Sequence, residues 1–438
     1  MEAYRAAPRF GIAARGACRR AASGLQAARL VAGSAAAQHG AMTSPTAQED
    51  AATSRARMNR VLAMYGPAVF AGALATRATD PLVVDIAHDL GSTAAQVALL
   101  GTAYTLPFAL VQPILGPVAD SVGKRRVVTI CVSLLSALLL LSAVAASLGW
   151  LMAFRALSGA AAGGMMPLTL AIMGDAVPLR DRQVALSRML VFGISGQIAG
   201  GAIAGPIAAF AGWRGMLVLC AAAAVVGMIA LLMASRGAAK EPITRYDPVV
   251  AARRYRTILS NPQAIPLYAT VAAEGGLVFG SFPFIATLMI SRGIGGTTEA
   301  GLAIGAFGLG GLAYAALAHW LLVRFGQAAV VRLGGGIGFL ALAGMGLAPA
   351  LWVAVLSGFL LGTAFYMIHN AIQTRATELS QQFRGSAVSL HAFSFFTGQS
   401  LGPIAFGLGA ATIGLGASLG VAAVLLAALS WSLARRPA

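Results

Sequence analysis

The stretch VVTICVSLLSALLLLSAVAASLGWLMAF, from Val127 to Phe154, decides the fold, because it contains no charged residue. A helix needs about 20 apolar residues to cross the hydrocarbon core of a bilayer. This stretch is longer, so it is predicted to hold most of one span, a tight turn at Leu148-Gly149-Trp150 and the start of the next span. Its apolar residues do not alternate with polar ones as in barrel strands, which indicates membrane-spanning helices.

The composition of the whole chain agrees with this interpretation. Of its 438 residues, 58% are hydrophobic and 10% are charged, whereas a soluble domain carries roughly 25% charged residues. A soluble surface cannot be built from such a chain, and lipid must cover much of it. The chain also contains 53 glycines, which spanning helices tolerate and use for close packing. We therefore expect an all-α membrane protein.

Apolar segments of spanning length recur along the chain, and another tight turn is expected at Ala348-Pro349-Ala350. We predict twelve spans, at residues 61–84, 96–119, 126–147, 150–174, 184–208, 213–235, 263–290, 299–323, 328–348, 351–375, 386–411 and 414–433.

The 31 basic residues set the predicted orientation. If both termini are cytoplasmic, the inner loops hold nearly all of them, and the outer loops hold only Arg214 and Arg292. Positive charge concentrated in cytoplasmic loops is the usual pattern of bacterial inner-membrane proteins. The net charge of +17 would then lie in short loops beside the anionic leaflet. We expect a multi-pass protein of the bacterial inner (plasma) membrane with no nucleic-acid partner.

Residues 1–57 differ from the rest, because they are rich in Ala and Arg and poor in acids. A signal peptide needs 7–15 uninterrupted apolar residues, and Arg19, Arg20 and Arg29 interrupt this segment. We expect a disordered tail, or an over-extended start with Met42 or Met58 as the true initiator. A transit peptide is the alternative on composition.

The longest polar break, from Ser235 to Pro262, divides the spans into six and six. We predict an N-terminal bundle at 58–236, a cytoplasmic linker at 237–262 and a C-terminal bundle at 263–438. The sequences of the two halves are similar in two places. Gly201-Ala-Ile-Ala-Gly205-Pro206 matches Gly398-Gln-Ser-Leu-Gly402-Pro403. Upstream of these, Arg182-Gln-Val-Ala185-Leu-Ser187 matches Arg384-Gly-Ser-Ala387-Val-Ser389. Parallel repeats of this kind occur in transporters whose two bundles rock about a midplane site.

The loop between spans 2 and 3 reads Gly116-Pro-Val-Ala-Asp120-Ser-Val-Gly123-Lys124-Arg125-Arg126. Gly116 would allow close helix approach, Gly123 a tight turn, and Asp120 a pair with a cytoplasmic arginine or a helix N-terminus. This segment resembles the signature gating loop of the major facilitator superfamily, and the resemblance covers the chain from about residue 60 to the end. It implies two six-helix bundles, a small-molecule substrate and a monomer.

Three further segments are similar to the twelve-span drug:proton antiporter branch: Val83 to Gly91, Arg155-Ala-Leu-Ser-Gly159-Ala-Ala-Ala-Gly163, and Gly201 to Pro206. The first lacks the usual proline, and Ala209-Phe210 replaces the Gly-Gly pair that normally follows the third. The resemblance implies that Arg155 takes part in proton coupling. The glycines and Pro206 of the third segment have an alternative role, in which they only pack and bend a helix.

Few charged residues lie inside the predicted spans apart from those counted with the loops or at span ends, and four stand out: Arg77, Asp80, Arg155 and Glu274. A charge in the membrane costs at least about 2.5–3.5 kcal/mol, so each is a candidate proton-coupling or substrate residue. Arg77 and Asp80 have i,i+3 spacing, which would place them on one helix face as an outer-gate ion pair or as a substrate or proton site. Glu274 has no charged neighbour in its own span. It would either carry a proton or form a fixed pair with Arg155.

Neutral polar residues inside the spans are candidates for a mixed cavity, although each would more often form an interhelical hydrogen bond. They are Tyr104, Gln112, Gln197, Tyr366, His369, Asn370, Gln373, His391 and Gln399. The rings of Phe279, Phe282 and Phe284 would suit an apolar substrate or face lipid.

We therefore predict proton-coupled efflux of a small amphipathic molecule by alternating access. Uptake by symport or facilitated diffusion stays open, and a non-transporting membrane sensor is the alternative from another class.

No ATP is expected, because the only Gly-Lys pair, Gly123-Lys124, lies outside a G-x-x-x-x-G-K-[ST] motif. The three cysteines lie far apart, so neither a metal site nor a cofactor is predicted, and no catalytic cluster indicates an enzyme.

Overall fold

A computed structural model of the chain describes residues 45–235, 248–380 and 382–435. The chain forms two compact units, Met1–Asn59 and Arg60–Ala438. The spanning helices described below belong to the second, except that the first of them begins at Pro45, within the first unit. Most of the predicted tail lies outside the described residues. From Pro45 onward the chain is helical, where a disordered tail was expected through residue 57. The alanine-rich composition of this stretch favours helix.

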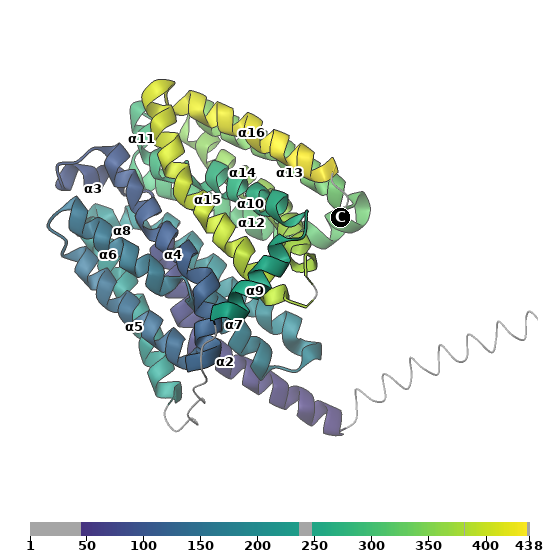
Figure 1. Cartoon of the computed structure of the whole chain (residues 1–438). Coiled ribbons are helices and arrows are strands. Elements are labelled where there is room, and N and C mark those ends of the chain that lie inside the picture. Colours follow the sequence, from purple (N-terminus) through teal and green to yellow (C-terminus); the bar gives the residue numbers. More distant parts are fainter. Residues whose placement is uncertain (1–44, 236–247, 381, 436–438) are drawn as a thin grey trace, which may run out of the picture. The chain divides into compact units, whose positions relative to one another are not determined.

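The described part of the first half contains seven helices (Figure 1): α2 (Pro45–Arg77), α3 (Val83–Asp89), α4 (Ala94–Val122), α5 (Lys124–Ala143), α6 (Leu148–Ala162), α7 (Met165–Ala176) and α8 (Leu179–Ser235). Helix α8 is two helices joined at Gly212, whose φ of 68° and ψ of 174° are not helical. Glycine adopts positive φ without steric penalty, so Gly212 supplies the break.

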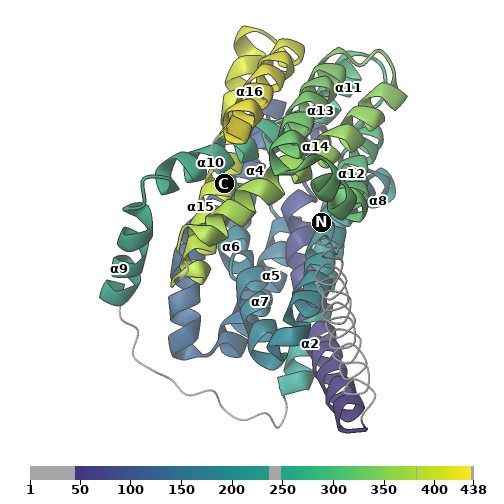
Figure 2. The ribbon, with the colours of Figure 1, turned by 90° about the vertical axis from the view of Figure 1, so that its right-hand side faces the viewer.

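The described second half begins with α9 (Pro248–Leu259), which Figure 2 shows leading into α10 (Ala264–Phe279). The remaining elements are η1 (Phe282–Phe284), α11 (Ile285–Ser291), α12 (Thr297–Phe325), α13 (Gln327–Leu347), α14 (Leu351–Glu378), α15 (Arg384–Thr412) and α16 (Leu415–Arg435). Helix α9 occupies part of the predicted linker at 237–262, and residues 236–247 lie outside the described part.

Within the described ranges, nine helical segments are long and apolar enough to cross a membrane. One of them, Val184–Ser235, contains both helices that meet at Gly212 and counts twice. The long helices α2 and α15, which are richer in polar residues, bring the number of spans to twelve. The predicted fold class, an all-α membrane protein, is confirmed, and no strand occurs in the described residues.

Several predicted boundaries were wrong. Span 1 was expected to reach residue 84, but α2 ends at Arg77 and a turn containing Pro81 separates it from α3. Proline lacks the N–H that a continuing helix needs. Spans 4 and 7 are each broken inside, at Gly163-Gly164 and at the η1 turn around Pro283.

The two predicted hairpins had different outcomes. The turn expected at residues 148–150 lies earlier, because Ser147 caps the start of α6 by accepting a hydrogen bond from the Trp150 amide at 3.4 Å. Ser is a favoured N-cap residue, which explains the shift. The hairpin at residues 348–350 is confirmed, since it joins α13 to α14.

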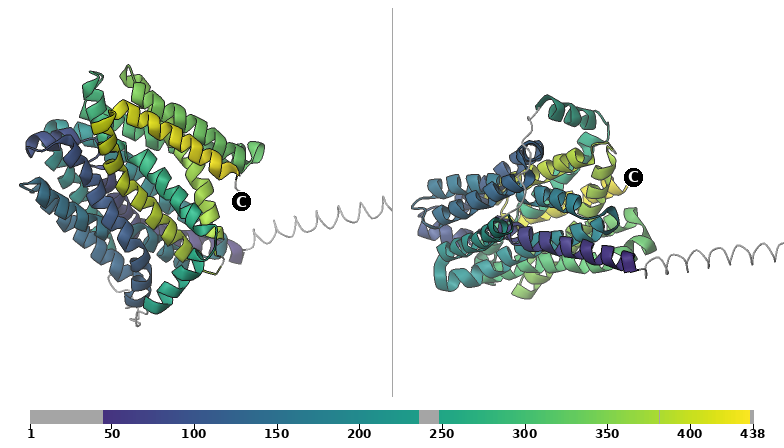
Figure 3. Two further views of the ribbon diagram at one scale, coloured as in Figure 1. Left: turned by 45° about the horizontal axis from the view of Figure 1, so that its top comes forward. Right: turned by 90° about the horizontal axis from the view of Figure 1, so that it is seen from below.

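Helices pack mainly within each half. In the first half α4 contacts α6 and α5 contacts both α6 and α8, while in the second half α10 contacts α15 and α13 contacts α14 and α16. Figure 3 shows the yellow α16 beside the green α13. Two major pairs connect the halves, α4 with α15 and α8 with α12. In the first pair, the Thr102 hydroxyl donates to the Ser400 carbonyl at 2.6 Å.

Candidate functional site

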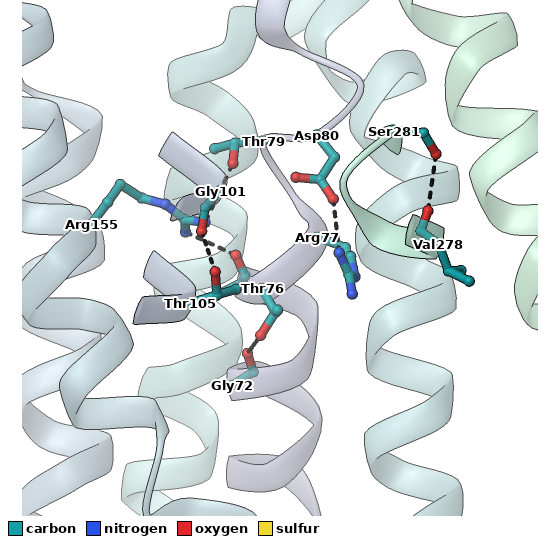
Figure 4. A network of polar contacts seen from close by, with 11 residues as sticks. Gly72, Thr76, Arg77, Thr79, Asp80, Gly101, Thr105, Arg155, Val278 and Ser281 are labelled. Atoms are coloured by element: carbon teal, nitrogen blue, oxygen red, sulfur yellow. Dashed lines mark hydrogen bonds and ion pairs between the residues drawn. The ribbon is translucent and has the colours of Figure 1, made fainter. Parts of the chain in front are cut away.

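An ion pair lies at the end of α2. Arg77 Nη1 donates to Asp80 Oδ2 at 3.2 Å, and both residues are buried (Figure 4). The predicted pairing occurs, but not on one helix face, because Arg77 is the last residue of α2 and Asp80 lies in the following turn. The chain brings them together by leaving the helix.

Arg77 also contacts the second half of the chain. Its guanidinium carbon lies 4.2 Å from the centre of the Phe279 ring and 5.2 Å from that of Phe282. The amide of Gln399 on α15 is best oriented with its oxygen toward Arg77, where it accepts from Nη2 at 3.0 Å. Cation–π contacts of this kind strengthen when they are shielded from water. Arg77 therefore joins α2 to α10, η1 and α15.

Arg155 on α6 is fully buried and holds the last turn of α2. Its Nη1 donates to the Ala75 carbonyl at 2.8 Å, and its Nη2 donates to the Thr79 hydroxyl at 3.3 Å. Figure 4 shows the guanidinium reaching toward Thr79. Its charge lies 4.2 Å from the Tyr104 ring centre. All of these partners belong to the first half, so the alternative pair with Glu274 is wrong.

Glu274 on α10 instead contacts His369 on α14. Its Oε2 lies 2.8 Å from His369 Nδ1, and the residue has no exposed surface. A proton must lie between these two atoms, because an unprotonated imidazole nitrogen and a carboxylate oxygen are both acceptors. Glu274 Oε1 has no hydrogen-bond partner among the described residues. The pair can thus hold one proton and take up another.

Aromatic rings surround this pair. Phe365 stacks on His369 with ring centres 4.8 Å apart, and Phe365 also lies 5.0 Å from Phe279. The ring of His391 on α15 lies 5.1 Å from that of His369, and His391 Nε2 is buried without a partner in the described part of the chain. A continuous aromatic path therefore connects Glu274 and His369 to the rings beside Arg77.

A small cavity of about 20 Å³ lies beside Arg77, enough for about one water molecule. It is lined by Arg77, Ile194, Gln197, Ile198, Phe279, Phe282, Ile304, Phe307, Gly308 and Tyr366. Arg77 is the one charged side chain in this described lining. The cavity draws on both halves of the chain, and its wall is mostly aromatic and aliphatic.

The predicted cavity residues therefore separate into groups. Gln197 and Tyr366 line the cavity, whereas Tyr104 and Gln112 donate to backbone carbonyls, at 3.2 Å to Gly72 and 2.7 Å to Gly163. These two fit the interhelical alternative. Asn370 and Gln373 are exposed on α14. His369 lies beside Glu274, and Gln399 lies beside Arg77.

Sequence reasoning missed the contributions of α12 to the cavity. Ile304, Phe307 and Gly308 line it, but apolar residues of a spanning helix look the same in the sequence whether they face lipid or a cavity. Phe279 and Phe282 line the cavity as the substrate hypothesis expected, while Phe284 packs elsewhere, with Leu288 and Phe406.

The predicted gating loop, Gly116 to Arg126, links helices of the first half through ion pairs of Lys124. Lys124 Nζ lies 2.7 Å from Asp175 Oδ2 on α7 and 3.8 Å from Asp120 Oδ1 on α4. Gly123 makes the predicted tight turn, with φ of 107°, and Arg125 is half-buried in the first turn of α5. The close approach expected at Gly116 is not found, because an added Cβ would meet nothing within 4 Å.

The antiporter-like motif lies at the contact between the halves. A Cβ on Gly205 would lie 2.5 Å from Thr298 Cα on α12, and one on Gly201 would lie 2.4 Å from a methyl carbon of Ile304. Pro206 follows within α8, before the break at Gly212. Small residues therefore let α8 and α12 approach closely, which fits the packing role.

The matching glycines of the second half have different neighbours. A Cβ on Gly398 would lie 1.7 Å from the Ala272 carbonyl oxygen, and one on Gly402 would lie 2.6 Å from that of Gly276. Both contacts are with α10 of the same half. The matched sequences thus do not make matched contacts.

The helices and the cavity between two halves define a multi-pass membrane protein with the build of a secondary transporter. The sequence matches the family model of the Major Facilitator Superfamily over residues 66–403. The chain belongs to this superfamily of transporters, whose members bind small-molecule substrates within the membrane and are generally not enzymes.

The chain is similar to several named proteins. It is 25% identical over 369 residues to the uncharacterized MFS-type transporter YwfA of Bacillus subtilis, covering 79% of this chain and 86% of that protein. A 145-residue stretch is 31% identical to a triacylglyceride transporter of Mycolicibacterium hassiacum. That match spans 32% of this chain but only 26% of the relative's length.

A solved structure of nucleoside transporter NupG has the same fold. The two align with a TM-score of 0.68 over 86% of this chain and 98% of that one, at 14% sequence identity. Other partial matches carry the names MFS efflux transporter aclA, of Aspergillus oryzae, and putative multidrug resistance protein MdtD, of Escherichia fergusonii.

Proposed function

We propose that this protein is a proton-coupled transporter that exports a small amphipathic molecule by alternating access. It would act as a monomer in the bacterial inner (plasma) membrane with both termini in the cytoplasm. The observation that carries the proposal is the buried contact between Glu274 and His369, 2.8 Å apart.

Burying an ionisable group inside a membrane costs free energy, so such a group usually has a function. This applies to the carboxylate of Glu274. Glu274 has one histidine partner and one oxygen without a partner among the described residues. A fixed structural pair would be expected to satisfy both oxygens. One proton that crosses a potential of 100 mV supplies about 2.3 kcal/mol, which is enough to bias a conformational equilibrium.

The aromatic path provides a physical link between proton and substrate. Phe365 contacts both His369 and Phe279, and Phe279 lies against Arg77 in the cavity wall. A change in charge or position at His369 would therefore shift the rings that shape the cavity.

The contacts between the halves support an inward-facing conformation. Thr102 bonds to Ser400, and Gly205 packs on Thr298. By the charge distribution of the loops, these residues lie in the outer halves of their spans. We propose that the bundles at 58–236 and 263–438 are closed outside in this state and rock apart there during transport, joined by the linker at 237–262.

The export direction draws support from partial relatives named as efflux and multidrug-resistance proteins. Uptake by symport or facilitated diffusion is the second candidate. Uptake or facilitated diffusion is favoured by Ala209-Phe210, which replaces the Gly-Gly pair of the antiporter motif. The Phe210 side chain is 78% exposed, so it does not take part in the close helix packing of that motif. A non-transporting sensor would not need the central cavity or a partly unsatisfied buried carboxylate.

Reconstituted liposomes with an internal pH dye would test the proposal. Amphipathic candidates would be added with and without an imposed pH gradient, and Glu274→Gln would be the matched variant. Antiport predicts proton and compound moving in opposite directions, and loss of this coupling in Glu274→Gln. Movement of proton and compound in the same direction would establish symport. Flux of the compound without flux of protons would indicate a facilitator. Absence of flux for every compound tested would favour the sensor.

A further inference from the structure

We propose that the cavity beside Arg77 binds an organic anion with an aromatic or aliphatic body, and that the acidic group of this anion pairs with Arg77. This inference rests on the proposed transport function and names the substrate class of the same site. The alternative class is an amphipathic cation.

The charge of the cavity favours an anion. Arg77 lines the cavity, and no carboxylate does so within the part of the chain that the structure describes. The two nearby acids already have partners, since Asp80 pairs with Arg77 and Glu274 with His369. A bound cation would lie close to Arg77, and no acid in the described lining would balance its charge.

Arg77 has hydrogen-bonding capacity to spare. A guanidinium carries five N–H donors in a planar fork that matches a carboxylate with two parallel bonds. Asp80 makes one contact at 3.2 Å, longer than the 2.7–2.9 Å usual for such charged bonds. Gln399 contributes a neutral oxygen at 3.0 Å. A substrate carboxylate can therefore compete with Asp80 for the same guanidinium.

The remaining walls fit an apolar body. Phe279 and Phe282 lie against Arg77, and Phe307 lies 5.3 Å from each of these two rings. Tyr366 and Gln197 add two polar groups to the lining. Apolar walls with a few placed polar groups are typical of small-molecule sites. Because the cavity is small in this state, the substrate must separate these rings when it enters.

Binding of three matched probes to the purified protein would test the proposal. The probes share one ring system and differ in charge: 2-naphthoate, its methyl ester and 2-naphthylmethylammonium. Wild type should bind 2-naphthoate at least about tenfold more tightly than the other two. Arg77→Gln should remove this preference, because 2-naphthoate would lose its guanidinium partner. Arg214→Gln is the matched control, because it removes an arginine that lies outside the cavity lining, and it should leave the binding of all three probes unchanged.

Asp80→Asn gives an independent test that keeps Arg77. If Asp80 competes with the substrate, this variant should bind 2-naphthoate several-fold more tightly, and it remains informative if Arg77→Gln does not fold. Tighter binding of the ammonium probe, equal binding of all three probes, or weaker 2-naphthoate binding by folded Asp80→Asn would overturn the proposal.

Proton release recorded in the same titrations separates the two proposals. Binding of 2-naphthoate without proton release would contradict antiport and leave the anion site standing. Binding of the ammonium probe with proton release would keep antiport and overturn the anion site.

Discussion

Glu274 and His369 meet between α10 and α14 with 2.8 Å between Oε2 and Nδ1, although 95 positions separate them in the sequence. Glu274 is wholly buried there. This contact joins a carboxyl group and an imidazole that share a proton.

Replacing His369 with Ala should destabilise the protein by about 1–3 kcal/mol, because Glu274 would then lose its hydrogen-bond partner inside the protein. The double variant Glu274→Gln/His369→Ala should lose about 1–2 kcal/mol less than the sum of the two single changes. Thermal unfolding in detergent would measure both. His319→Ala, at an exposed position of α12, is the matched control. Additive effects would show that the pair is not coupled.

Gly205→Ala should reduce transport at least about tenfold, since the added Cβ would lie 2.5 Å from Thr298 Cα and would keep α8 and α12 from closing. Gly116→Ala is the matched control, because its Cβ meets open space. It should transport like wild type even though Gly116 belongs to the signature loop. Initial rates of probe transport in liposomes would compare them. Equal loss in both variants would show that the close approach of α8 and α12 at Gly205 is not what transport requires.

Asp89 at the end of α3 joins two predicted outer loops. Its carboxylate accepts hydrogen bonds from Arg214 and from Trp213 Nε1, and these bonds hold its pKa below the ordinary value of 3.8. A lowered folded-state pKa gives stability that is fully present above pH 3.8 and is lost as the pH falls through the folded value. Wild type should therefore melt at a higher temperature than Asp89→Asn at pH 7.

The difference in melting temperature between the two proteins should shrink as the pH falls below 3.8 and should also shrink at high salt, because the site is exposed. A constant difference at all pH values would show that Asp89 does not stabilise the fold through its charge. The Arg214 guanidinium also donates to the Ala145 carbonyl just beyond α5, which explains why an outer loop keeps a basic residue.

The spans were predictable because a bilayer imposes length and apolarity on every helix that crosses it. The breaks inside spans were not. The Gly163-Gly164 break resembles other glycine pairs in this chain. Pro81 indicates that a helix ends nearby, but the end of α2 at Arg77 also involves Arg155, which donates to the Ala75 carbonyl and the Thr79 hydroxyl. These contacts come from another span.

The charged residues of the candidate site could be selected from the sequence, but the apolar lining and the arrangement of the residues could not. A charge in an apolar segment marks Arg77, Asp80, Arg155 and Glu274 as candidates, and the spacing of the first two predicted their pairing. The partner of Glu274 could not be chosen among distant polar residues, since helix periodicity carries no information about which spans are neighbours. Phe307 gave no signal because its surroundings in the sequence are uniformly apolar.

Proton release by the purified protein on substrate binding tests most directly whether Glu274 carries the coupled proton. With a probe that binds, wild type should release about one proton per bound molecule in weakly buffered detergent solution, and Glu274→Gln should bind the probe without release. Binding to wild type without release, or equal release by Glu274→Gln, would contradict the account.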